Sequence, residues 1–159
     1  MIEYFTDPGE IETLVGEFEL CTINPATFKH YQHLTVALWY VVHFPYPEAA
    51  EKMRLGIQKL AAAYGKMGYH ETITMFWLEM VRGFVAEAGD EESMVSLANC
   101  LAEKFVDKNV INEYYSSELI GSAKAKVEWV APDLKPLEFA SEVFKSAVHK
   151  PAFPPACAG

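Results

Sequence analysis

The chain has 159 residues, of which 51% are hydrophobic and 22% charged, the composition of a globular protein large enough to bury a core. Its 13 basic and 22 acidic side chains give a formal net charge of −9. A field of that sign repels nucleic-acid phosphates and anionic lipid headgroups. We therefore expect neither nucleic acid nor a membrane as a partner.

Helical periodicity dominates the first half of the chain, and proline and glycine mark where it starts and stops. Asp7-Pro8 and Asn24-Pro25 each place a capping residue directly before a proline, the order expected at a helix start. The spacing of apolar residues predicts helices over 8–19, 25–44, 47–65 and 71–87.

The second half continues in the same way but with shorter segments. Apolar spacing predicts helices over 94–105, 110–115, 117–129 and 137–149. No break joins two segments that could each build a core, so we predict one domain over 1–150, followed by a flexible Pro- and Ala-rich tail over 151–159. The predicted fold is an all-α, single-domain helical bundle of about seven or eight helices.

The apolar run at 34–44 contains His43 and is well short of the roughly 20 residues that a membrane span needs. The N-terminus has no basic segment leading into an apolar stretch, as a secretory signal would. We therefore expect a cytoplasmic protein. Trp39 and Tyr40 lie off the main apolar stripe of their predicted helix, so we expect a monomer or a homodimer that covers them.

The features most suggestive of function are histidines near two predicted helix starts. His30 and His33 lie early in the helix over 25–44, and His70 and Glu71 begin the helix over 71–87. A single helix separates these two, so an up-and-down bundle would make them parallel, with their N-termini at the same end. We expect the four side chains to converge on one pocket.

Two imidazoles at i, i+3 point the same way, and a third imidazole with a carboxylate would complete a common ligand set for a divalent transition metal. The sequence therefore predicts a metal site of His30, His33, His70 and Glu71, holding zinc, iron, manganese or nickel. The residues expected to line the pocket around it are Tyr31, Tyr69, Thr74 and Trp77.

Two alternatives remain open at this point. The same groups could form a metal-free pocket that binds a small molecule or performs acid–base chemistry. Helix N-termini favour neutral imidazole and attract anions, so a small anionic molecule would suit that pocket. Alternatively, the polar cluster could only fix helix packing in a noncatalytic helical interaction module.

Three stretches resemble a family of small uncharacterised bacterial all-helical proteins. They are Phe28-Lys29-His30-Tyr31-Gln32-His33-Leu34, Tyr69-His70-Glu71-Thr72-Ile73-Thr74, and Tyr115-Ser116-Ser117-Glu118-Leu119 with Ala131-Pro132-Asp133-Leu134-Lys135-Pro136-Leu137. The resemblance covers roughly residues 12–137, and the His-x-x-His-Leu and Tyr-His-Glu-Thr-Ile-Thr elements recur together in it. It implies a shared site of His30, His33, His70 and Glu71, but it supplies no reaction.

Overall fold

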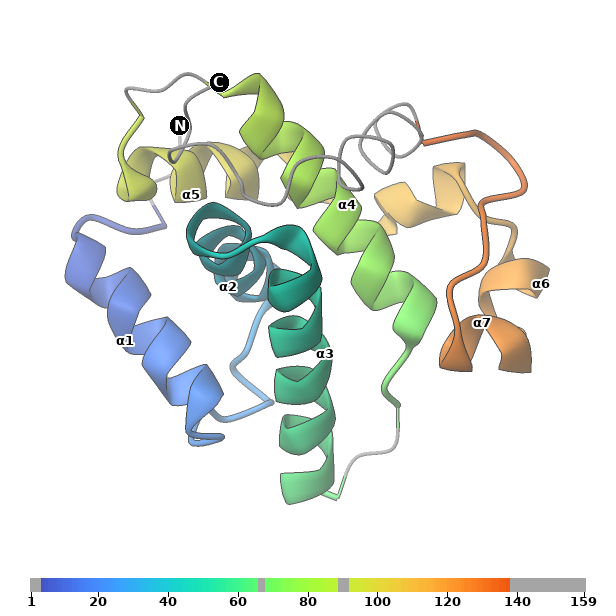
Figure 1. Cartoon of the computed structure of the whole chain (residues 1–159), viewed down its shortest axis with the longest axis horizontal. Coiled ribbons are helices and arrows are strands. Elements are labelled where there is room, and N and C mark those ends of the chain that lie inside the picture. Colours follow the sequence, from blue (N-terminus) through green and yellow to red (C-terminus); the bar gives the residue numbers. More distant parts are fainter. Residues whose placement is uncertain (1–3, 66–67, 89–91, 138–159) are drawn as a thin grey trace.

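The computed structural model describes residues 4–65, 68–88 and 92–137. Within these ranges it holds seven α-helices and one 3₁₀ helix, η1, and no strand (Figure 1). The predicted all-α fold class is confirmed. In chain order the elements are α1 (Pro8–Glu19), α2 (His30–His43), α3 (Tyr46–Ala63), α4 (Glu71–Glu87), α5 (Met94–Lys104), η1 (Lys108–Glu113), α6 (Ser117–Ile120) and α7 (Ala123–Val127).

Local signals set the start of α1, which has the bounds that the sequence predicts. The Asp7 carboxylate accepts the N–H of Gly9, and Glu10 reaches back to the N–H of Asp7, so that two otherwise unpaired donors of the first turn are satisfied. The apolar face of the helix then enters the core through Ile11, Leu14, Val15 and Phe18.

The helix α2 begins at His30, not near Pro25 as the sequence suggested. Asn24 caps a turn instead, because its side chain accepts the N–H of Ala26 and its carbonyl accepts the N–H of Thr27. Proline is as well suited to the second position of a turn as to the first position of a helix. His30 and His33 therefore lie in the first turn of α2.

The helix predicted over 117–129 is divided into α6 and α7. The Ser116 hydroxyl accepts the N–H of Leu119 at the start of α6, and the Ser122 hydroxyl accepts the N–H of Ala125 at the start of α7. A serine hydroxyl that bonds to the backbone favours a new helix start over a continuous helix. The hydrogen bond from Ala125 to the Ser122 hydroxyl, together with Gly121, explains the break between α6 and α7.

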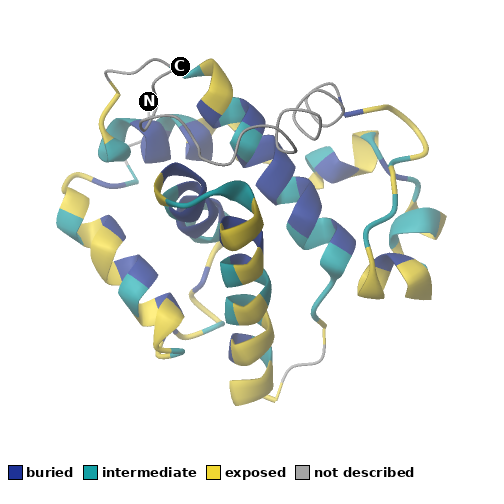
Figure 2. Cartoon of the chain, viewed as in Figure 1, coloured by how far each residue is buried: buried dark blue, intermediate teal, exposed yellow. Residues whose placement is uncertain are grey.

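The centre of the fold is formed by α2 and α4. The first contacts α1, α3, α4 and α5, and the second contacts α2, α3 and α7. Buried residues follow both helices (Figure 2). In Figure 1, α2 is seen nearly end-on whereas α4 is seen along its length, so the two cross instead of running parallel. The ring of His30 accordingly meets Trp77 in the middle of α4, not its first turn.

Two buried polar side chains attach irregular segments to this helical core. Asn99 of α5 accepts the backbone N–H groups of residues 4 and 5 and donates to the carbonyl of Phe5. Thr72 of α4 donates to the carbonyl of Glu128 and accepts the N–H of Val130. Because buried polar groups are costly when unpaired, these bonds fix both segments against their helices.

One argument for a homodimer does not hold. Tyr40 is only 1% exposed: it packs near the ring of Phe18, and its hydroxyl donates to Glu19 at 2.8 Å. It was expected off the apolar stripe, but α1 covers that side of α2. Trp39 is partly buried and stacks on His43. Self-association therefore stays a prediction with less support.

The predicted last helix over 137–149 lies outside the described residues apart from Leu137, which is buried, and so does the predicted tail over 151–159. Among the helices that the structure describes, none has the length and apolar character needed to cross a membrane.

Candidate functional site

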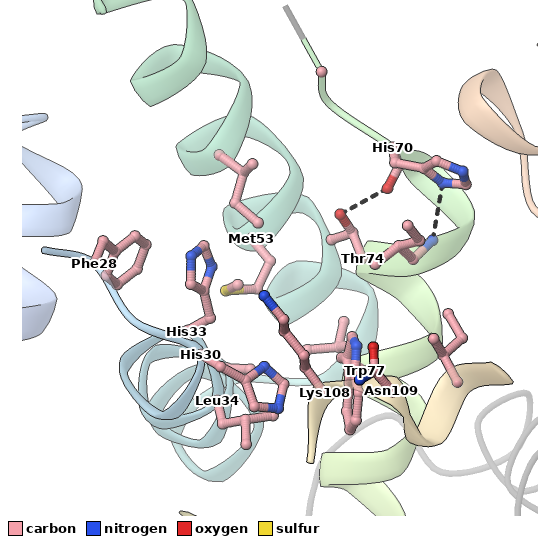
Figure 3. Close-up of a pocket in the computed structure, with 16 residues that line it drawn as sticks. Phe28, His30, His33, Leu34, Met53, His70, Thr74, Trp77, Lys108 and Asn109 are labelled. Carbon is pink, nitrogen blue, oxygen red and sulfur yellow. Dashed lines mark hydrogen bonds between the residues drawn. The ribbon is translucent and has the colours of Figure 1, made fainter. Parts of the chain in front are cut away.

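A pocket of about 500 Å³ lies between α2, α3, α4 and η1 (Figure 3). It extends along α4 from His70 at the N-cap to Trp77 and Leu78 two turns later. Its walls are mostly apolar, and they include Phe28, Leu34, Met53, Ile57, Trp77 and Ile111. His30, His33 and His70 all contribute to the lining, but they do so in different ways.

His30 is the first residue of α2, and its ring packs edge-on against Trp77, with 4.8 Å between ring centroids. Its Nε2 lies 3.0 Å from the carbonyl oxygen of Phe105, which can only accept, so we assign the proton to Nε2. Burial and the charge of Lys108 lower the pKa of His30, while the Phe105 carbonyl and the charge of Asp107 act in the opposite direction. In the neutral ring Nδ1 is an acceptor, and it has no hydrogen-bond partner among the described residues.

His33 lies three residues after His30, in the same first turn of α2, and stacks on Phe28, with 3.8 Å between ring centroids. Burial lowers the pKa of His33 to about 4, and the charge of a protonated His30 lowers it further, whereas a hydrogen bond to the backbone of Phe28 acts in the opposite direction. The pocket wall therefore contains two imidazoles, from His30 and His33, that are neutral at pH 7.

His70 lines the pocket, but both of its ring nitrogens bond to the backbone. It is the N-cap of α4, where its Nδ1 accepts the N–H of Ile73 at 3.2 Å, and its Nε2 donates to the carbonyl of Ile120 at 2.6 Å. Figure 3 shows its ring turned away from His30 and His33. Both ring nitrogens are engaged, so a metal ion or a transferred proton would have to displace one of these bonds.

Glu71 is bound by a neighbouring arginine. The Nε and Nη2 atoms of Arg54 lie 2.9 Å and 2.7 Å from its two carboxylate oxygens, and the Tyr69 hydroxyl donates to the first oxygen at 2.6 Å. These hydrogen bonds, with Arg54 the larger contributor, lower the pKa of Glu71. Glu71 does not line the pocket, because Arg54 and Tyr69 hold its ionised carboxylate beside α3.

Two of the four residues predicted to line the pocket do so. Thr74 and Trp77 belong to the wall, and the Thr74 hydroxyl donates to the carbonyl of His70 at 2.9 Å. Tyr31 instead packs against the ring of Tyr4, with 4.7 Å between centroids, and Tyr69 is directed at Glu71. Both tyrosines therefore stabilise the surroundings of the pocket without facing it.

The structure does not assemble the four predicted metal ligands. Across residues 4–65, 68–88 and 92–137, no group of three or more His, Cys, Asp or Glu side chains is arranged to hold a metal ion. His30 and His33 share a wall of the pocket, whereas Glu71 lies outside it and the ring nitrogens of His70 bond to the backbone.

The sequence interpretation missed the residues that η1 contributes. Lys108 and Asn109 line the pocket and are exposed to solvent. The local signal was present, because the Asp107 carboxylate accepts the N–H of Asn109 and starts the 3₁₀ helix there. Nothing in the apolar spacing connects this segment with His30, which lies much earlier in the chain.

A second buried polar cluster lies between α3 and α4, away from the pocket lining. The Tyr46 hydroxyl donates to Glu79 at 2.6 Å, and the guanidinium of Arg82 lies over the Tyr46 ring at 3.8 Å from its centroid. Glu79 is 1% exposed, and one of its oxygens has no hydrogen-bond partner in the described part of the chain. Burial raises the pKa of Glu79, so its carboxyl resists ionisation.

No model of a known protein family matches the chain, and no curated protein or solved structure matches it. The resemblance to small bacterial proteins therefore stays a prediction.

Proposed function

We propose that this protein binds a small organic molecule in the pocket between α2, α3, α4 and η1. The observation that carries the proposal is the pocket itself, about 500 Å³ in volume, with apolar walls and a few polar groups. Ligand sites in proteins have this size and this composition. The polar groups come from separate elements, His30 and His33 from α2 and Lys108 and Asn109 from η1, as in sites that orient a ligand.

Binding fits the pocket better than acid–base catalysis does. A general base works best when its pKa lies near the working pH. The pKa of His33 is about 4, which makes it a weak base at pH 7. The Nε2 proton of His30 is donated to the carbonyl of Phe105, and among the described residues no carboxylate of the pocket lining orients either ring. The two imidazoles are therefore suited to hydrogen bonding with a bound molecule.

A divalent transition metal is the second candidate occupant. Neutral imidazole nitrogen is a good ligand for zinc, iron, manganese or nickel, and His30 and His33 offer two such nitrogens at one wall. Such an ion would need further ligands from water or from a bound molecule. Elemental analysis of protein purified without an affinity tag tests this candidate, and stoichiometric metal that is lost in His33→Ala would favour it.

The test of the small-molecule proposal uses N-phenyl-1-naphthylamine, an uncharged probe that fluoresces in apolar surroundings. Ile57 lies in the pocket wall on α3, so Ile57→Trp fills part of the cavity. Leu55 is on the same helix, is 44% exposed and does not line the pocket, which makes Leu55→Trp the matched control. Circular dichroism and thermal melting establish that both variants are folded.

We expect saturable binding of one probe per chain to the parent protein and to Leu55→Trp, and at least tenfold weaker binding to folded Ile57→Trp. The proposal is wrong if the parent protein shows no saturable binding. It is also wrong if Ile57→Trp binds the probe as the parent does. A noncatalytic helical interaction module, whose polar groups only fix helix packing, predicts the first of these two results.

A further inference from the structure

The charge distribution around the pocket differs from that of the chain as a whole. The chain carries 22 acidic and 13 basic residues, yet among the described residues no aspartate or glutamate lines the pocket. Apart from the histidines, Lys108 is the one charged residue among the lining residues that the structure describes. The exposed Asp107 precedes Lys108 but does not line the pocket. An ammonium group at the wall of an apolar cavity attracts a negative charge, and no carboxylate of the described lining competes for it there.

Lys108 lies close to the polar wall of the pocket. It is the first residue of η1, and its positive charge lowers the pKa of His30 whereas the charge of the preceding Asp107 raises it, so both charges lie within electrostatic range of His30. Figure 3 shows its side chain extending from η1 across the pocket toward α2. Within the described part of the chain, Lys108 forms no ion pair with an acidic side chain.

The lining has an exposed, charged part and a buried, apolar part. Lys108 and Asn109 are exposed to solvent, whereas Leu34 and Leu78 are 2% and 1% exposed and Met53 is 4% exposed. Asn109 adds an amide donor beside the ammonium group. A ligand that is anionic at one end and apolar at the other would place its charge at the Lys108 ammonium group and its apolar body against the buried wall.

We infer that the natural ligand is an organic monocarboxylate with an apolar body of about ten carbon atoms, a size suited to a pocket of this volume. This inference rests on the proposed function, because it names the class of molecule that the same pocket takes. Lys108 pairs with the carboxylate, and Asn109 donates a hydrogen bond to it. Phe28, Met53 and Ile57 pack against the apolar body.

Competition experiments test the inference with three molecules of the same chain length, decanoate, decanol and decylamine, each displacing N-phenyl-1-naphthylamine. The parent protein is compared with Lys108→Met, which removes the charge and retains much of the apolar stem. Lys59→Met is the matched control, because Lys59 is exposed on α3, does not line the pocket and gives the same change in net charge.

We expect decanoate to displace the probe from the parent protein at concentrations at least threefold lower than decanol, and decylamine to be the weakest. Lys108→Met should weaken decanoate binding three- to tenfold, the range for one partly solvated ion pair, and leave decanol unchanged. Lys59→Met should change neither.

Different results would refute the monocarboxylate assignment and the pocket proposal. If the probe binds and decanol competes as well as decanoate, or if Lys108→Met binds decanoate as the parent does, the monocarboxylate assignment is wrong and the pocket proposal stands. If decylamine is the strongest competitor, the sign of the assigned charge is wrong. If the parent protein does not bind the probe or any of the three molecules, both the assignment and the pocket proposal are wrong.

Discussion

Acid should destabilise this protein through His33, and His33→Gln should remove that part of the acid sensitivity. The folded pKa of about 4 lies below the ordinary value of 6.5 because the ring is buried beside His30 and against Phe28. Between these two values the unfolded chain binds a proton that the folded chain does not. Stability is therefore fully present above about pH 6.5 and is lost as the pH falls toward 4.

From pH 7 to pH 4.5 the linkage amounts to about 2 kcal/mol of unfolding free energy. The assay is urea denaturation of the parent protein and of His33→Gln at both pH values. His43→Gln is the matched control, because His43 is exposed at the other end of α2. An NMR titration of the His33 ring measures its pKa directly. A midpoint above pH 6, or an equal loss of stability in His33→Gln, would refute the reasoning.

Two further predictions concern helix packing and capping. A methyl group at Gly56 on α3 would overlap the buried ring of Phe18, so Gly56→Ala should cost about 1–3 kcal/mol in urea denaturation. Gly16→Ala on α1 has nothing within 4 Å of its added carbon, so its free energy of unfolding should increase by about 0.5–1 kcal/mol. A Gly56→Ala variant more stable than Gly16→Ala would contradict this packing. His70→Ala should cost about 1–3 kcal/mol and leave probe affinity unchanged, while His70→Asn, which keeps the cap but not the bond to Ile120, should cost less. Altered probe affinity in folded His70→Ala would instead give the ring a role in binding.

The sequence was most informative where a helix start depends on its own neighbours. The bounds of α1 follow from Asp7, Pro8 and Glu10, and those of α4 from apolar spacing and the acidic first turn. Asn24 and Ser122 show the limit of such signals, because each side chain bonds to nearby backbone in a way that suits either a turn or a new helix start. The sequence does not say which of these the tertiary contacts will favour.

The site was predictable only in part, because it depends on how helices cross. The expectation of parallel helices would bring His30 and His70 together at one end, but α2 crosses α4 near Trp77 instead. Both histidines still contribute to one pocket because the pocket extends along α4. The role of Lys108 was not foreseeable, because only the folded chain brings η1 against the first turn of α2.

The effect of Glu79 on the pH dependence of stability should oppose that of His33. Burial raises the pKa of Glu79 above its ordinary value, so its contribution to stability is fully present below about pH 4.5 and is lost as the pH rises through the folded pKa. Glu79→Gln cannot ionise, and its stability relative to the parent should therefore increase between pH 4.5 and pH 7 in urea denaturation.

Tyr46→Phe removes the donor to the carboxyl and should be destabilising, by about 1–3 kcal/mol and more at pH 7 than at pH 4.5. Glu87→Gln, at an exposed site at the end of α4, is the matched control and should show no such trend. The prediction is wrong if the stability difference between Glu79→Gln and the parent is the same at both pH values, because Glu79 would then cause no loss of stability as the pH rises. The pH dependence of the parent's stability would in that case contain the contribution of His33 with no opposing contribution from Glu79.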